Sequence, residues 1–145
     1  MAKYEELSPN FKHALITKLS STSPFWALLG MELEDAKKGW AKVRLPFADK
    51  LKQPMGIAHG GAIFAIADSA VVMALLGMVS KEETVTTVES KINFIRPFDR
   101  GELTAEARIV NKGSTIAIGE ADIFNTDGLQ IAKCLCTFLI LKNPR

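Results

Sequence analysis

The residues best suited to chemistry lie between positions 53 and 68. The segment reads Gln53-Pro54-Met55-Gly56-Ile57-Ala58-His59-Gly60-Gly61, and an apolar stretch of helical character follows. Glycines at the start of a helix leave its first N–H groups unshielded. Those donors, at the positive end of the helix dipole, suit an oxyanion or a polarised carbonyl. Close packing of Gly60 and Gly61 against a strand is an equally good explanation from spacing alone.

Asp68 is the more informative residue, because it is a carboxylate in apolar surroundings. Its neighbours along the chain are Ala65, Ile66, Ala67, Val71 and Val72. A carboxylate is costly to bury without a partner, and no Lys or Arg lies within one helical turn. Structural carboxylates usually cap a helix or pair with a cation, whereas this one is mid-helix. Apolar surroundings make a carboxylate a stronger base or nucleophile, so we interpret Asp68 as functional.

The spacing of these groups predicts an assembly. Gly61 and Asp68 are seven residues apart, so they share a helix face but are separated by about 10 Å along the axis. A reacting atom must lie about 3 Å from both the donor and the attacking group. One helix can hardly supply both to one substrate. We therefore expect Gly60 of one chain to face Asp68 of a second chain across a twofold axis.

The elements that must position these groups follow from hydrophobic periodicity. Ser-Pro pairs at 8–9 and 23–24 predict two short helices, and a turn at Lys37-Lys38-Gly39 predicts a hairpin. A long helix over roughly 60–79 is apolar almost all round, which indicates burial on all sides. Alternating segments predict further strands over 84–96, 102–110, 114–124 and 129–141.

These elements predict an α+β fold in which an antiparallel sheet of about five to six strands wraps around one long buried helix. We expect a single domain over 1–145, with the helical segment 1–30 as part of it. In the strand over 84–96, alternation predicts Val88, Ile92 and Phe94 on one face and Thr87, with Lys91, on the other. The last strand is apolar on both faces, which favours sheet-to-sheet dimerisation.

Composition excludes several classes of protein. The chain has 145 residues, with 18 Lys and Arg against 16 Asp and Glu, and lacks the dense basic stripe of a nucleic-acid-binding protein. Two Cys and two His at unsuitable spacings predict no metal site. The close pair Cys134 and Cys136 fits a reduced, cytoplasmic protein.

Residues 1–10 have no signal-peptide character. Asp68, inside the only stretch long enough to span a bilayer, argues against a membrane helix.

The motif Gln-x-x-Gly-x-x-His-Gly-Gly, with Asp68 nine residues after His59, resembles that of the hotdog-fold acyl-CoA thioesterases. The strand that ends Ile92-Asn93-Phe94-Ile95-Arg96-Pro97 and the restart at Gly101-Glu102-Leu103 add to the likeness. The branch that the chain most resembles is the phenylacetate-pathway (PaaI-like) group. The likeness covers about residues 25–141, and the His-Gly-Gly motif followed by Asp is its most specific part.

The resemblance implies hydrolysis of an acyl-CoA thioester to a carboxylic acid and CoA. It implies that the Gly60 amide and the Gln53 side chain hold the thioester carbonyl oxygen, and that Asp68 of the other subunit acts as general base or nucleophile. His59 would orient the glycine turn, and Thr87 would position water or serve only as an ordinary strand residue.

The resemblance also bears on substrate binding, cofactors and assembly. The candidate substrate-binding residues are Gly61, Lys91, Arg96, Lys112 and Ser114, and the last four are the candidates for holding the CoA part. The four with polar or charged side chains could equally be ordinary solvated residues. No metal or redox cofactor is implied, since CoA belongs to the substrate. The expected assembly is a homodimer or a dimer of dimers.

Two alternative functions remain open. A hotdog enoyl-CoA hydratase or dehydratase would use an Asp–His or His–Glu pair, and neither arrangement occurs here. A non-catalytic acyl-CoA-binding module would have no need of Asp68. Thiol release by the protein, and its dependence on Asp68, would separate both from a thioesterase. The sequence does not reveal the acyl group.

Overall fold

The computed structural model describes residues 4–143, so positions 1–3 and 144–145 of the expected domain lie outside the described range. Along the chain the helices and strands are α1 (Pro9–Thr22), α2 (Pro24–Leu29), β1 (Glu32–Lys37), β2 (Trp40–Pro46), a short 3₁₀ helix (Asp49–Leu51), α3 (Gly60–Leu76), β3 (Glu83–Phe94), β4 (Glu102–Lys112), β5 (Ile116–Phe124) and β6 (Gln130–Lys142).

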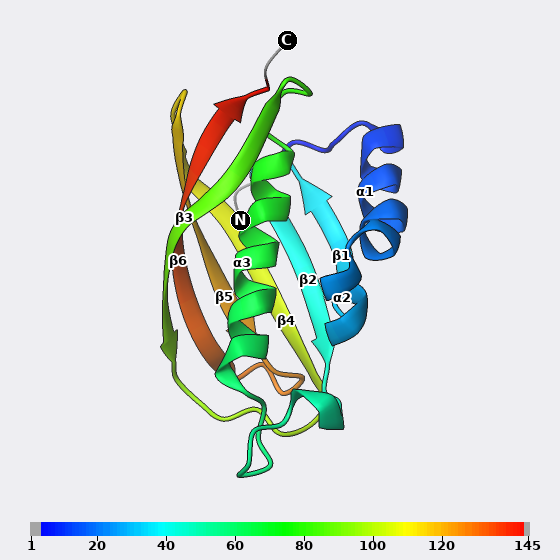
Figure 1. Cartoon of the computed structure of the whole chain (residues 1–145), viewed down its shortest axis with the longest axis vertical. Helices are drawn as coiled ribbons and strands as arrows, with labels where there is room; N and C mark the ends of the chain where they lie inside the picture. The colour runs from blue at the N-terminus through cyan, green and yellow to red at the C-terminus, as the bar shows by residue number, and fades with distance from the viewer. Residues whose placement is uncertain (1–3, 144–145) are drawn as a thin grey trace.

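The six strands form one antiparallel sheet in the order β1-β2-β4-β5-β6-β3. The sheet curves around α3, and α1 and α2 lie beside β1 at the opposite side from β3 (Figure 1). This is the expected hotdog-like α+β architecture. The edge strands are therefore β1 and β3, and α1 packs against β1 and α2.

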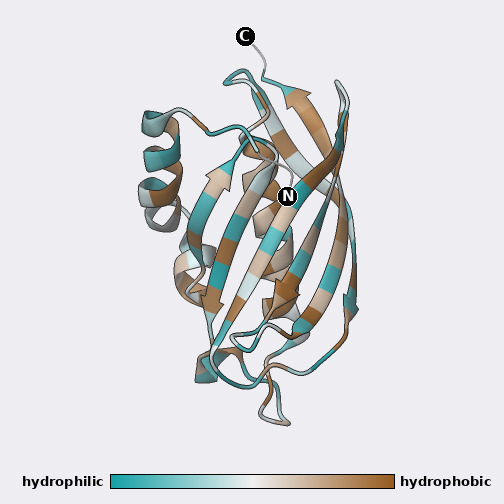
Figure 2. Ribbon diagram, turned by 180° about the vertical axis from the view of Figure 1, so that it is seen from behind, coloured by the Kyte–Doolittle hydropathy of each residue, from teal (hydrophilic) through white to brown (hydrophobic). Residues whose placement is uncertain are grey.

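The core fills the space between α3 and the concave face of the sheet. Residues such as Ile66 and Val71 on α3 and Leu103 and Phe138 on the strands are fully buried. Seen from behind, polar and apolar residues alternate along the strands (Figure 2), as expected for a sheet with one face on the core. Ion pairs cross the outer face from strand to strand, such as Lys133 with Glu120 and Asp122 at 3.2 and 3.0 Å.

The prediction that α3 is buried on all sides was wrong, and the helix is also shorter than predicted, ending at Leu76. Along one stripe Gly61 is exposed, and Phe64, Asp68, Val72 and Leu76 are only partly buried. The sheet of one chain covers the other faces of the helix but not this one. The open face contains the only carboxylate of the helix.

The predicted alternation of the strand over 84–96 was also wrong at one residue. The pairing of β3 with β6 shifts register between Thr87 and Glu89, which is a β-bulge. Thr87 pairs with Phe138, and Ser90 pairs with Cys136; both of these β6 partners face the core. The bulge thus puts Thr87 on the same face as Ile92, toward α3.

The two N-terminal helices begin and end near the predicted residues. Pro9 and Pro24 occupy the first helical positions, but Ser8 and Ser23 make no side-chain capping bond. Gly30 ends α2 with φ of 87°, in the left-handed region that glycine adopts readily.

Close contact between α3 and β5 requires glycine at position 119. A Cβ atom added there would lie 2.4 Å from Val71 Cγ1 and 3.2 Å from the Arg108 carbonyl oxygen. We predict that Gly119→Ala lowers the free energy of unfolding by about 1–3 kcal/mol, through overpacking, as measured by urea denaturation. Adding Val71→Ala removes the clashing methyl groups, so the double variant should lose less than the sum of the single losses; strict additivity would contradict this explanation.

Candidate active site

The N-terminus of α3 presents one unused backbone donor. His59 is the N-cap residue, and its Nδ1 accepts a hydrogen bond from Gly61 N at 2.9 Å. The imidazole therefore carries its proton on Nε2. Within residues 4–143, Gly60 N has no hydrogen-bond partner. Of the two glycine amides, that of Gly60 is free to donate to a ligand, whereas that of Gly61 already donates to His59 Nδ1.

Gln53 is held in the turn that precedes α3. Its backbone N–H donates to the Ile57 carbonyl at 2.8 Å, and its carbonyl accepts from Gly56 N at 2.9 Å. The side-chain oxygen Oε1 accepts a short hydrogen bond from Met55 N. With its oxygen occupied, the Gln53 amide has its NH₂ group left to offer, which is a donor.

A cavity of about 430 Å³ connects this turn to the start of α3 and the end of β3. Gln53 and Gly60 contribute to its wall, and most of the rest is apolar: Ile57, Ala58, Ile63, Phe94, Ile95 and Phe98. The Phe94 ring lies directly over Gly60, since a Cβ there would meet its Cζ at 3.0 Å. The donors at the helix start therefore open into an apolar cavity.

Asp68 points from α3 toward β3. Its Oδ1 accepts a hydrogen bond from Thr87 Oγ1 at 2.9 Å and a longer one from Ser90 Oγ at 3.4 Å. No bond to Oδ2 and no cation partner of Asp68 occurs within the described chain. The carboxylate is half-buried and Thr87 is exposed, so the group faces the open side of the helix.

Two buried thiols lie behind Ser90. Ser90 Oγ is 3.2 Å from Cys136 Sγ, and the sulfur atoms of Cys134 and Cys136 are 3.5 Å apart. The hydrogen bond between the thiols, with burial, raises the pKa of Cys134, and the same bond lowers the pKa of Cys136. Among the described residues, no cluster of His, Cys, Asp and Glu could hold a metal ion.

The structure brings some predicted site residues together and leaves others apart. Within one chain, Gln53, His59, Gly60 and Gly61 lie at the start of α3, and Thr87 lies against Asp68 two turns further along. The rise from Gly60 to Asp68 is about 12 Å. One chain thus holds a donor group and a carboxylate that are too far apart to act on one carbonyl.

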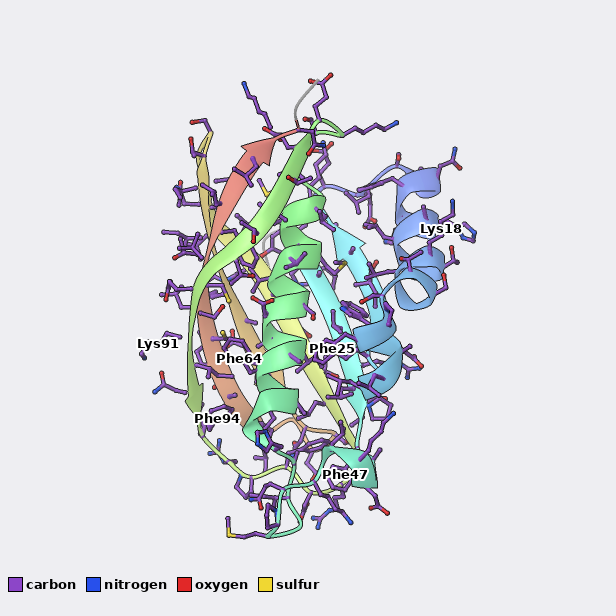
Figure 3. The ribbon with its side chains drawn as sticks, viewed as in Figure 1. Lys18, Phe25, Phe47, Phe64, Lys91 and Phe94 are labelled. Atoms are coloured by element: carbon purple, nitrogen blue, oxygen red, sulfur yellow. The ribbon has the colours of Figure 1, made fainter. Side chains whose placement is uncertain are left out.

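The expected CoA contacts are dispersed. Arg96 lines the cavity and donates to the Gln130 carbonyl at 2.7 Å. Lys91 points away from α3 (Figure 3), and its Nζ donates to Asn93 Oδ1 at 2.6 Å. Lys112 and Ser114 lie at the β4–β5 turn, at the end of the sheet opposite to the start of α3 (Figure 1). Of these four side chains, only Arg96 lines the cavity that contains Gly60 in one chain.

Ser90 was missed by the sequence analysis. Strict alternation places it on the same face as Val88 and Ile92, but an isolated serine in a strand carries no chemical signal. The bulge after Thr87 brings the Thr87 hydroxyl onto the face where Ser90 already lies, so that both hydroxyl groups reach Asp68.

Within residues 4–143 no helix has the length and apolar character needed to cross a bilayer.

Comparison with known proteins shows the family. The model of the thioesterase superfamily matches residues 55–132. The 1,4-dihydroxy-2-naphthoyl-CoA hydrolase of Listeria monocytogenes is 28% identical over 119 residues, covering 81% of this chain and 95% of the relative. The medium/long-chain acyl-CoA thioesterase YigI of Salmonella typhimurium is 26% identical over 137 residues, covering 81% and 85%.

A solved structure supports the fold. The PaaI protein of Escherichia coli superimposes with a TM-score of 0.79 at 21% identity, covering 86% of this chain and 89% of that one. It is one neighbour among many, so the fold is shared while the branch stays a prediction. The matched residues 55–132 include the His59-Gly60-Gly61 turn, all of α3 with Asp68, and β3. The chain therefore belongs to the thioesterase superfamily.

Proposed function

We propose that this protein hydrolyses acyl-CoA thioesters at sites shared between two copies of the chain. The observation that carries the proposal is Asp68, a carboxylate on the open face of an apolar helix whose Oδ1 is held by hydroxyl groups and whose Oδ2 has no partner among residues 4–143. Such a group is suited to proton transfer or nucleophilic attack.

The electrophilic half of the site is the start of α3. The thioester carbonyl oxygen would accept from the unused Gly60 N–H, with the Gln53 NH₂ group as second donor. Both donors are held in position before substrate binds. The His59 cap holds the start of the helix at Gly60, and the hydrogen bond from Met55 N to Oε1 holds the Gln53 side chain. Fixed donors stabilise the oxyanion of the tetrahedral intermediate without reorganisation. The apolar cavity wall fits an apolar acyl group, and Arg96 would meet the CoA part.

The attacking half comes from the second copy. β3 is a long edge strand, and residues 4–143 leave its outer edge unpaired. Exposed apolar side chains accompany that edge, with Val88 57% and Phe94 53% exposed. A second chain that covers this edge and the open face of α3 would bring its Asp68 to the Gly60 amide across a twofold axis.

Hydrolysis of the thioester can follow one of two routes. Asp68 takes a proton from water, the water oxygen bonds to the carbonyl carbon, and the carbonyl oxygen becomes an oxyanion facing Gly60. Collapse breaks the carbon–sulfur bond, and the proton goes to the departing CoA thiolate. Alternatively Asp68 attacks the carbonyl carbon directly, CoA leaves as the thiolate, and water hydrolyses the resulting anhydride and supplies the proton to the thiolate. In heavy-oxygen water, label enters the Asp68 carboxylate in a single turnover only in this second route, when water attacks the Asp68 carbon of the anhydride. Thr87 would hold the carboxylate or the water in either one.

The first prediction concerns Asp68→Asn, which keeps the size of the side chain but removes the charge. Thiol release from an acyl-CoA panel should fall about 10²–10⁴-fold, because the base or nucleophile is lost. Binding of a non-hydrolysable thioether analogue, measured by calorimetry, should persist. Glu106→Gln, at an exposed strand position, is the control and should keep wild-type turnover. Wild-type turnover by Asp68→Asn, or enoyl-CoA hydration without thiol release, would contradict the proposal.

The second prediction concerns the Gly60 amide. Gly60→Pro removes this N–H at the first helical position, which proline favours, and the extended His59 backbone (φ −64°, ψ 137°) suits a residue before proline. Thiol release should fall about 10²–10³-fold with the thermal unfolding midpoint nearly unchanged. Gly60→Ala keeps the N–H and should retain much more activity; an equal loss in both variants would point to packing against Phe94 instead.

A further inference from the structure

Asp68 Oδ1 has a second hydroxyl partner besides Thr87. Ser90 Oγ lies 3.4 Å from this oxygen and 3.2 Å from Cys136 Sγ. Ser90 and Cys136 are direct register partners on β3 and β6, and Cys136 is fully buried. Three side chains from three elements thus form a line from the carboxylate into the core.

The hydrogen bonds along this line can run in either direction, because a serine hydroxyl has a single hydrogen and rotates freely. When Asp68 is ionised it can only accept, so Ser90 donates to Oδ1 and accepts from the Cys136 thiol. When Asp68 carries a proton on Oδ1, the acid can donate to Ser90, and the Ser90 hydrogen turns to Cys136 Sγ. Ser90 therefore has both a donor and an acceptor partner in either state.

We propose that Ser90, backed by Cys136, is a positioning residue that holds Asp68 through Oδ1 in both of its protonation states. The free Oδ2 is thereby directed to the water or the thioester. This inference rests on the proposed function, since it assumes that Asp68 is the base or nucleophile. It assigns the buried thiol of Cys136 a role in the reaction without contact with the substrate.

The test compares Ser90→Ala with Ser90→Thr. Removing the hydroxyl should lower kcat about tenfold, the effect of one lost hydrogen bond to a charged group, while KM changes less than twofold. Ser90→Thr keeps the hydroxyl and should restore most of the kcat. An unchanged kcat in Ser90→Ala, or an equal loss in Ser90→Thr, would overturn the proposal.

The thiol is tested separately, which keeps the proposal falsifiable if Ser90→Ala fails to fold. Cys136→Ala should lower kcat several-fold, and Cys136→Ser should recover it because serine also donates and accepts. Cys134→Ala, an equally buried thiol that does not contact Ser90, is the control and should leave kcat unchanged. In Ser90→Ala the further change Cys136→Ala should cost nothing more. Equal kcat in Cys136→Ala and Cys134→Ala would overturn the role of the thiol.

Asp68→Asn is measured in the same assay to separate two kinds of failure. If Asp68→Asn is inactive and Ser90→Ala is fully active, the positioning role is wrong while the proposed function stands. If Asp68→Asn has wild-type turnover, the proposed function itself is wrong, and with it the present inference.

Discussion

An α-helix rises about 1.5 Å per residue, so α3 holds the Gly60 amide and the Asp68 carboxylate about 12 Å apart however the rest of the chain packs. Both groups depend on the same helix. Glycines must occupy its first positions so that an amide N–H is accessible. Its apolar faces must be buried against the sheet so that the helix is stable. The distance between the Gly60 amide and the Asp68 carboxylate of one chain is therefore fixed. Only the α3 helix of a second chain can place a carboxylate close to this amide.

The surroundings of α3 are consistent with this constraint. The sheet covers the helix on every side except the stripe that contains Gly61, Phe64, Asp68 and Val72. The same side of the molecule has β3 as an open edge, whereas α1 packs against the other edge strand. A chain that served its own active site would have no need to leave an apolar helix face and a long strand edge uncovered together.

Much of the fold could be predicted from the sequence, because hydrophobic periodicity reports directly on burial. The apolar segment after His59 and the alternation in 102–110 gave α3 and β4 nearly at their observed positions. What periodicity could not supply is the uncovered face of α3. An apolar side chain that awaits a second molecule has the same sequence signature as one buried within the chain.

Candidate site residues could be proposed from the sequence where residue type alone carries the chemistry and not where geometry does. Asp68 stands out as a charge in an apolar helix, and Gly60 as a side-chain-free helix start. Ser90 is an ordinary strand serine on the face toward α3, and only the bulge after Thr87 brings the Thr87 hydroxyl onto that same face beside it. The availability of Gly60 rather than Gly61 likewise depends on one contact, the bond from Gly61 N to the His59 ring.

The claim that each site combines two copies is tested most directly by complementation. Asp68→Asn and Gly60→Pro chains, co-expressed with different affinity tags, are purified as the mixed species that contains both. In that species one site pairs an intact Gly60 with an intact Asp68 from the other chain, and the second site has neither. We expect recovery of about half the wild-type thiol release per dimer. Activity no higher than that of the two parent variants would contradict it.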